Sequence, residues 1–78
     1  MTDEYNVVQF FPGGDYEYVM RNVDAKTAVE RAQALTESVG GRLGTTERVI
    51  ITDGGDCTNF EWKFGVGVTF PQRAHDKP

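Results

Sequence analysis

The chain has 78 residues, of which 38% are hydrophobic, and its eight Lys and Arg against twelve Asp and Glu give a formal net charge of −4. This length allows one small domain, whose thin core supplies about 3–5 kcal/mol. The single cysteine, Cys57, excludes an internal disulfide, and no Cys/His pair has zinc-ligand spacing. A second subunit is the remaining usual source of stability, while the negative charge opposes contact with nucleic-acid phosphates.

The first 23 residues predict a β-hairpin. Residues 5–11 form a strand with apolar side chains on both faces, so both faces need cover. Residues 12–15, Pro-Gly-Gly-Asp, form a turn, because proline presets φ and glycine accepts the positive φ of tight turns. Residues 16–23 form the second, antiparallel strand.

A helix is predicted over residues 25–39. Asp24 is a suitable N-cap, and Gly40 with Gly41 supplies a left-handed stop. Residues 42–46 are predicted to be a loop. The predicted buried stripe is small and poor at covering a wide sheet: Ala25, Ala28, Val29, Ala32, Leu35 and Val39.

The second half predicts another hairpin. Residues 47–53 read as a central strand, and residues 53–56, Asp-Gly-Gly-Asp, form its turn. Residues 58–64 alternate aromatic and polar side chains, and residues 66–70 continue as a short edge segment after a bend. Residues 1–71 therefore form the domain, and residues 72–78 are expected to be a disordered tail.

The fold class that follows is α+β, in the order ββαββ. An antiparallel sheet of about four strands carries one helix packed on one face. The strand order is not determined at this level.

An aromatic sheet face gives the main functional prediction. Tyr16 and Tyr18 share one strand face, and Phe60 and Trp62 share another. One alanine-rich helix cannot cover all these rings, and soluble monomers rarely expose a large apolar patch. We therefore expect a homodimer, joined through the face opposite the helix by these four residues. In the alternative, a bent sheet, the 42–46 loop and the tail cover the rings within one chain.

Chemically reactive residues are sparse, and we expect no enzyme, catalytic residue, cofactor or metal site. Cys57 lacks a nearby base, because His75 lies in the predicted tail. Asp53 and Asp56 offer too few oxygen ligands for a calcium loop. No apolar run reaches the roughly 20 residues that span a bilayer, and no secretory signal is recognised, so a cytoplasmic protein without a membrane partner is expected.

Two further binding functions are weighed. Phe60, Trp62 and Tyr18 could stack single-stranded nucleic acid, but only Arg21, Lys63 and Arg48 could accompany them. Nucleic acid is therefore not the expected partner. The alternative function to self-association is a small acidic inhibitor that mimics nucleic acid and occupies a basic groove on another protein.

Overall fold

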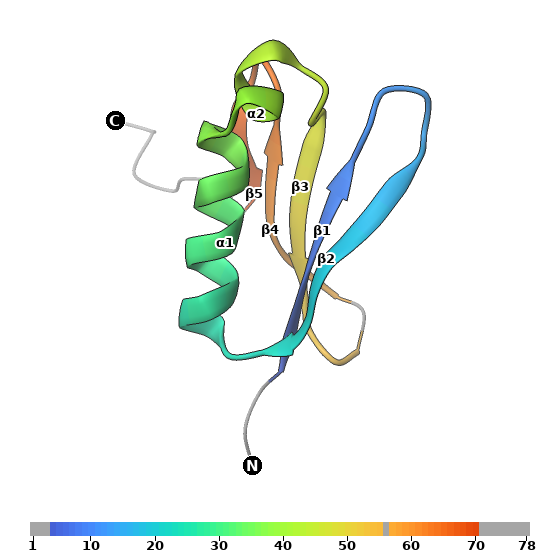
Figure 1. Ribbon diagram of the computed structural model, residues 1–78. Helices are drawn as coiled ribbons and strands as arrows, with labels where there is room; N and C mark the ends of the chain where they lie inside the picture. The colour runs from blue at the N-terminus through green and yellow to red at the C-terminus, as the bar shows by residue number, and fades with distance from the viewer. Residues whose placement is uncertain (1–3, 56, 71–78) are drawn as a thin grey trace, which may run out of the picture.

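The computed structural model describes residues 4–55 and 57–70, which form a five-stranded antiparallel sheet and two helices (Figure 1). The strands are β1 (Tyr5–Phe10), β2 (Tyr16–Val23), β3 (Arg48–Thr52), β4 (Thr58–Lys63) and β5 (Gly67–Phe70), and the helices are α1 (Ala25–Glu37) and α2 (Val39–Leu43). The α+β class is confirmed. The sheet has five strands rather than about four, because the short edge segment pairs with β4 as β5. The predicted tail, residues 72–78, lies outside the described residues.

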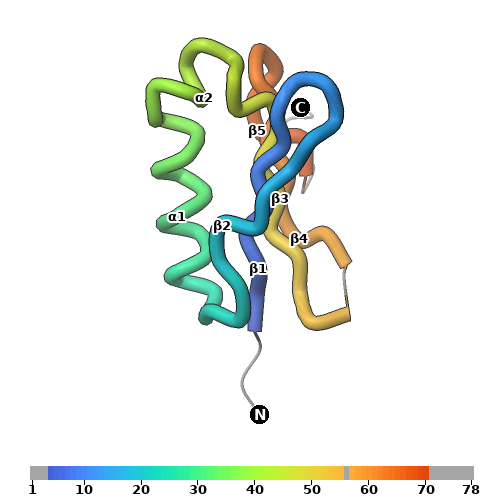
Figure 2. Tube along the Cα trace, turned by 45° about the vertical axis from the view of Figure 1, so that its right-hand side comes forward, coloured from blue at the N-terminus to red at the C-terminus, as the bar shows by residue number. Residues whose placement is uncertain are grey.

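The two hairpins meet through β1 and β3, giving the strand order β2-β1-β3-β4-β5. In β1, Val7 and Val8 are 0% and 3% exposed and point to opposite faces, as expected for a strand flanked on both sides. The tips of the β1–β2 and β4–β5 hairpins lie at the same end of the molecule as α2 (Figures 1 and 2). This arrangement brings residues from three strands together at that end.

The two Gly-Gly-Asp turns are built differently despite their shared sequence. Gly13 and Gly14 both adopt positive φ, 97° and 99°, which closes the first turn. The second turn is held by Asp53, whose carboxylate accepts hydrogen bonds from the backbone N–H groups of Gly55 and Cys57, at 2.9 and 3.1 Å. The hydrogen bond from the Cys57 backbone is the largest of several that lower the pKa of Asp53.

Helix α1 begins as predicted and buries a narrow stripe against one sheet face. The carboxylate of Asp24 accepts a hydrogen bond from the N–H of Thr27 at 2.9 Å, which caps the helix. The helix lies over β1, β2 and β3. Its three buried residues complete a core cluster of Val7, Ala28, Ala32, Leu35, Val49 and Ile51.

The predicted end of the helix is wrong, and so is the 42–46 loop. Helix α1 ends at Glu37, because the hydroxyl of Ser38 donates to the carbonyl of Leu35 and accepts from the N–H of Gly41, at 2.6 and 3.1 Å. Ser38 thereby ends α1 and caps α2, and the left-handed stop comes later, at Gly44 with φ 95°.

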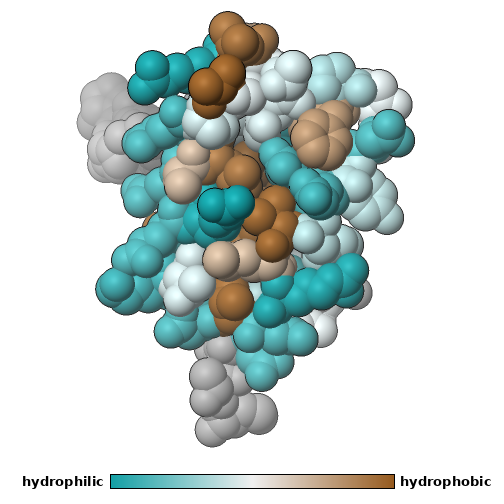
Figure 3. Space-filling view, viewed as in Figure 1, coloured by the Kyte–Doolittle hydropathy of each residue, from teal (hydrophilic) through white to brown (hydrophobic). Residues whose placement is uncertain are grey.

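Three residues that the sequence placed on the buried stripe lie outside it, and one of them, Ala25, is exposed at the start of α1. Val29 is 47% exposed, and Val39, which follows the break at Ser38, is 72% exposed. Apolar side chains gather between α1 and the sheet and again at the end formed by α2 (Figure 3). The helix therefore covers less of the sheet than its sequence suggested.

Candidate functional site

The four residues predicted to form one interface lie on opposite faces of the sheet. Phe60 and Trp62 pair with Ile51 and Val49 and pack against the core beneath α1. Tyr16 and Tyr18 belong to the other face. The prediction that all four share the face opposite the helix is therefore wrong. The alternation of β4 shows that Phe60 and Trp62 share a face, but it does not show which face of the sheet this is. The register of β4 with β3 decides that they face the helix.

The surface opposite α1, here called the open face, is left free by both helices (Figure 2). Its rings lie close together: Phe10 and Tyr16 have centroids 5.6 Å apart, and Tyr16 and Tyr18 are 6.2 Å apart in an edge arrangement. Tyr16 is 61% exposed and Tyr18 39%. The residues of this face include Asn6, Val8, Phe10, Tyr16, Tyr18, Arg21, Arg48, Ile50, Thr52, Glu61, Lys63 and Thr69.

Cationic side chains accompany these rings. The guanidinium of Arg21 lies 4.1 Å from the ring centroid of Tyr18, and that of Arg48 lies 4.8 Å from that of Phe10. Lys63 pairs with Arg48 across β3 and β4 and is exposed. Cations over aromatic faces are attracted by the ring quadrupole. The sequence named these three cations as companions of Tyr18, and the register of four strands places them on one face with Tyr18 and Phe10.

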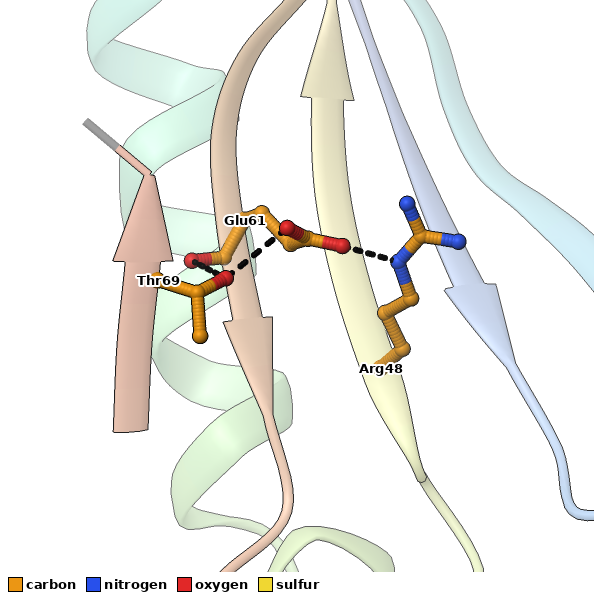
Figure 4. Close-up of polar contacts among 3 residues, drawn as sticks. All are labelled: Arg48, Glu61 and Thr69. Carbon is orange, nitrogen blue, oxygen red and sulfur yellow. Dashed lines mark hydrogen bonds and ion pairs between the residues drawn. The ribbon is translucent and has the colours of Figure 1, made fainter. Parts of the chain in front are cut away.

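A polar chain of three residues crosses β3, β4 and β5 on the open face (Figure 4). The hydroxyl of Thr69 donates to one carboxylate oxygen of Glu61 at 2.8 Å, and Nε of Arg48 donates to the other. Burial alone raises the pKa of Glu61, but hydrogen bonds from Thr69 and Arg48, with the charges of Arg48 and Lys63, outweigh it and lower the pKa. Glu61 is therefore ionised and fixes Arg48 in place.

Among the described residues, positive charge is concentrated on the open face and negative charge on the rest of the surface. Within its strands, the open face carries three cations (Arg21, Arg48 and Lys63) against the carboxylate of Glu61, and Glu47, just before β3, lies beside two of them in the hollow described below. The rest of the described chain carries three cations against eight carboxylates. An acidic protein thus presents one basic, aromatic face, which its net charge conceals.

A hollow of about 330 Å³ opens at the end of the sheet where the two hairpin tips meet. It is formed by the last residues of β1, the first of β3 and the last of β4, held in register by hydrogen bonds from Glu47 N–H to the Phe10 carbonyl and from Phe64 N–H to the Glu47 carbonyl, at 2.8 and 2.9 Å. The residues that line it include the aromatic Phe10, Phe11 and Phe64 and the charged Glu47, Arg48 and Lys63.

The remaining candidate residues form no reactive group in the described chain. Cys57 is a free, exposed thiol, while His75 and Asp56 lie outside the described residues. Over residues 4–55 and 57–70, no three His, Cys, Asp or Glu side chains are grouped to hold a metal ion. Within the same residues, neither helix has the length and apolar character needed to cross a membrane.

Comparisons with known proteins give no relative for this chain. No protein-family model matches it, and neither curated proteins nor solved structures give a significant match. We therefore infer function from the residues and geometry described above.

Proposed function

We propose that this chain is a small, non-catalytic binding module that holds a single-stranded nucleic acid on its open face. The observation that carries the proposal is the gathering of Arg21, Arg48 and Lys63 with exposed tyrosine rings on one face of an otherwise acidic protein. We place it in the cytoplasm, a compartment in which the exposed thiol of Cys57 stays reduced.

The chemistry of the face suits unpaired bases. Tyr16 and Tyr18 offer ring surface for stacking, and a base stacked on an aromatic side chain contributes about 1–3 kcal/mol. The guanidinium of Arg21, 4.1 Å from the ring centroid of Tyr18, adds a planar charged group that can stack on a base and attract phosphate. A duplex hides its bases from such a face, so the single strand is the favoured form.

Charge also argues against self-association through this face. A two-fold dimer brings identical surfaces together, so the three cations of one copy would oppose those of the other. An anionic partner removes that repulsion. The acidic remainder of the chain confines such a partner to the open face.

The test measures binding of a fluorescein-labelled oligo(dT) of 15 nucleotides by anisotropy, at several salt concentrations. Three cations predict a slope of log K against log salt of about −2. Arg21→Glu should abolish binding, while the matched control Arg31→Glu, an exposed arginine of α1, should retain it. Equal losses in both variants would contradict the proposal, since they would reflect overall charge alone.

A further control separates nucleic acid from an acidic protein partner. Tyr18→Leu should weaken oligo(dT) binding by about fivefold or more while leaving the salt slope unchanged, because it removes stacking and no charge. If poly-glutamate binds as tightly as oligo(dT) and Tyr18→Leu has no effect, the partner is an acidic protein and the nucleic-acid proposal fails.

Self-association remains a second candidate function, through a different surface. Val39, Leu43 and Val66 are 72%, 72% and 70% exposed at the end formed by α2 and the β4–β5 turn, here called the apolar end (Figure 3). A second copy is the matching occupant, because these exposed apolar side chains leave water when two copies meet there, and Arg42 is the one cation of α2. Light scattering after size exclusion, at several concentrations, should give a dimer that Leu43→Ser converts to monomer and Val29→Ser does not. A strict monomer at all concentrations overturns this candidate.

A further inference from the structure

The hollow between the two hairpin tips combines features that a simple anion site lacks. Phe10, Phe11 and Phe64 give it apolar walls, and Arg48 and Lys63 place two cations beside them. Its volume of about 330 Å³ is at the lower end of the range for small-molecule sites. A ligand that uses all of these groups has a flat ring and a negative charge.

The cations of the hollow remain available to a ligand. Arg48 contacts Glu61 through Nε, so its two Nη groups are still donors, and Figure 4 shows them directed away from Glu61. Lys63 is exposed beside it. A guanidinium and an ammonium at neighbouring register positions form a natural contact for one phosphate group.

Glu47 favours a ligand that carries a hydrogen-bond donor as well as a negative charge. Glu47 lines the same hollow, and a carboxylate at this place repels a bare anion or a second phosphate but can accept a hydrogen bond from an amino group or a ribose hydroxyl. The position of Phe64 is set by Gly44, where an added Cβ would lie 3.1 Å from the ring. Gly44 thus lies against part of the aromatic wall, while Phe64 remains 44% exposed to a ligand.

We infer that the hollow is a binding site for one nucleotide, with the base between the phenylalanine rings, the phosphate on Lys63 and Arg48, and the sugar or base edge on Glu47. This inference deepens the proposed function and rests on it, since a nucleotide here would anchor one end of a strand that continues over the open face. A free mononucleotide and a nucleotide within a strand share this chemistry.

The experiment is a ¹H–¹⁵N NMR titration of the full chain with AMP, adenosine, inorganic phosphate and oligo(dA) of 10 nucleotides. We expect AMP to shift the backbone signals of Phe11, Phe64 and Val66, with adenosine and inorganic phosphate each binding at least tenfold more weakly. Lys63→Gln should weaken AMP about tenfold, whereas Arg42→Gln, an exposed arginine of α2, should leave it unchanged.

The outcomes separate this inference from the proposed function. Shifts at the hollow with AMP but none on the open face with oligo(dA) support the nucleotide site and overturn the strand-binding function. Oligo(dA) shifts confined to Tyr16, Tyr18 and Arg21 support the function and overturn the nucleotide site. Equal binding of AMP and phosphate, or unchanged AMP affinity in Lys63→Gln, also overturns the site.

Discussion

Gly41→Ala is expected to destabilise the domain, although alanine is the better helix former. Gly41 lies in α2, and replacing glycine by alanine inside a helix ordinarily gains about 1 kcal/mol. Gly41 is buried where α2 turns back against the end of α1. An added Cβ would lie 2.3 Å from the carbonyl oxygen of Thr36 and 2.5 Å from that of Leu35. Both distances are far inside normal contact.

The size of the loss in unfolding free energy depends on which atoms must move to make room for the new Cβ. The clashing atoms are backbone carbonyls, so no side-chain rotation relieves them, and α2 must shift away from α1. Overpacking of this kind costs about 1–3 kcal/mol and occasionally more. The upper part of that range applies here, and subtracting the helix gain leaves a net loss of about 2 kcal/mol. Against a core worth about 3–5 kcal/mol, that is a large fraction of the stability.

The assay is thermal and urea unfolding followed by circular dichroism and by the fluorescence of Trp62, the single tryptophan. A loss of about 2 kcal/mol lowers Tm by about 10 °C in a domain of this size. Gly54→Ala is the matched control, because no atom lies within 4 Å of its added Cβ and its φ is not positive, so it should gain a few tenths of a kcal/mol. A Gly41→Ala variant as stable as the parent would refute the packing of α2 on α1.

Three further predictions address the cap, the polar chain and the two sheet faces. Asp24→Ala should lower Tm at pH 7, and the difference from the parent should shrink in acid, because the hydrogen bond from Thr27 lowers the pKa of Asp24 and its contribution is lost as pH falls. Glu61→Gln should make the free energy of unfolding less sensitive to acid. Because folding lowers the pKa of Glu61, its carboxylate contributes its full stabilisation above the ordinary pKa of 4.5 and loses it as the pH falls through the folded pKa. Urea midpoints of both proteins from pH 7 to 3 measure the difference. Trp62→Ala should cost at least about 2 kcal/mol in urea unfolding, while Tyr16→Ala should stay within about 0.5 kcal/mol, because only Trp62 packs on the core; equal effects would contradict the assignment of faces.

Local signals in the sequence predicted the elements well. The N-cap at Asp24 and the helical spacing of Ala28, Ala32 and Leu35 fixed the start and buried side of α1. Proline and glycine marked the first turn, and the alternation of residues 58–63 marked β4. These features depend on neighbours within a few residues, which is why a single sequence reveals them.

Long-range features were beyond the same reasoning. Whether Trp62 faces the helix depends on its pairing with Val49, thirteen positions away, and a one-residue change of register reverses the answer. The end of α1 was misread because Gly41 resembles a helix stop, whereas it serves the close approach of α2 to the carbonyl of Thr36. Ser38 ends the helix, and serine is a residue type that often caps helices. The sequence placed the helix end at Gly40 and Gly41 instead.

The sequence named Tyr18 with Arg21, Arg48 and Lys63 but set a nucleic-acid partner aside, for a related reason. Net charge is a sum over the whole chain, but a sheet sends alternate side chains to opposite faces and brings distant strands together. Arg21, Arg48 and Lys63 come from three strands, and none stands beside another in the sequence. Their place on one face appears only once the register is known, and the proposal of a nucleic-acid partner rests on it, whereas the net charge of the composition argued against such a partner.

The hydrophobic core lies on the helix side of the sheet, so the exposed residues of the open face can serve binding. Beneath α1, Phe60 and Trp62 help to close a core that contains small helix residues, so changes there act on stability. On the open face, Val8 and Ile50 are already covered, at 3% and 8% exposed, by the longer side chains around them. Tyr16 and Arg21 are therefore free of any part in the core, and substitutions at these two positions can alter binding without unfolding a domain of marginal stability.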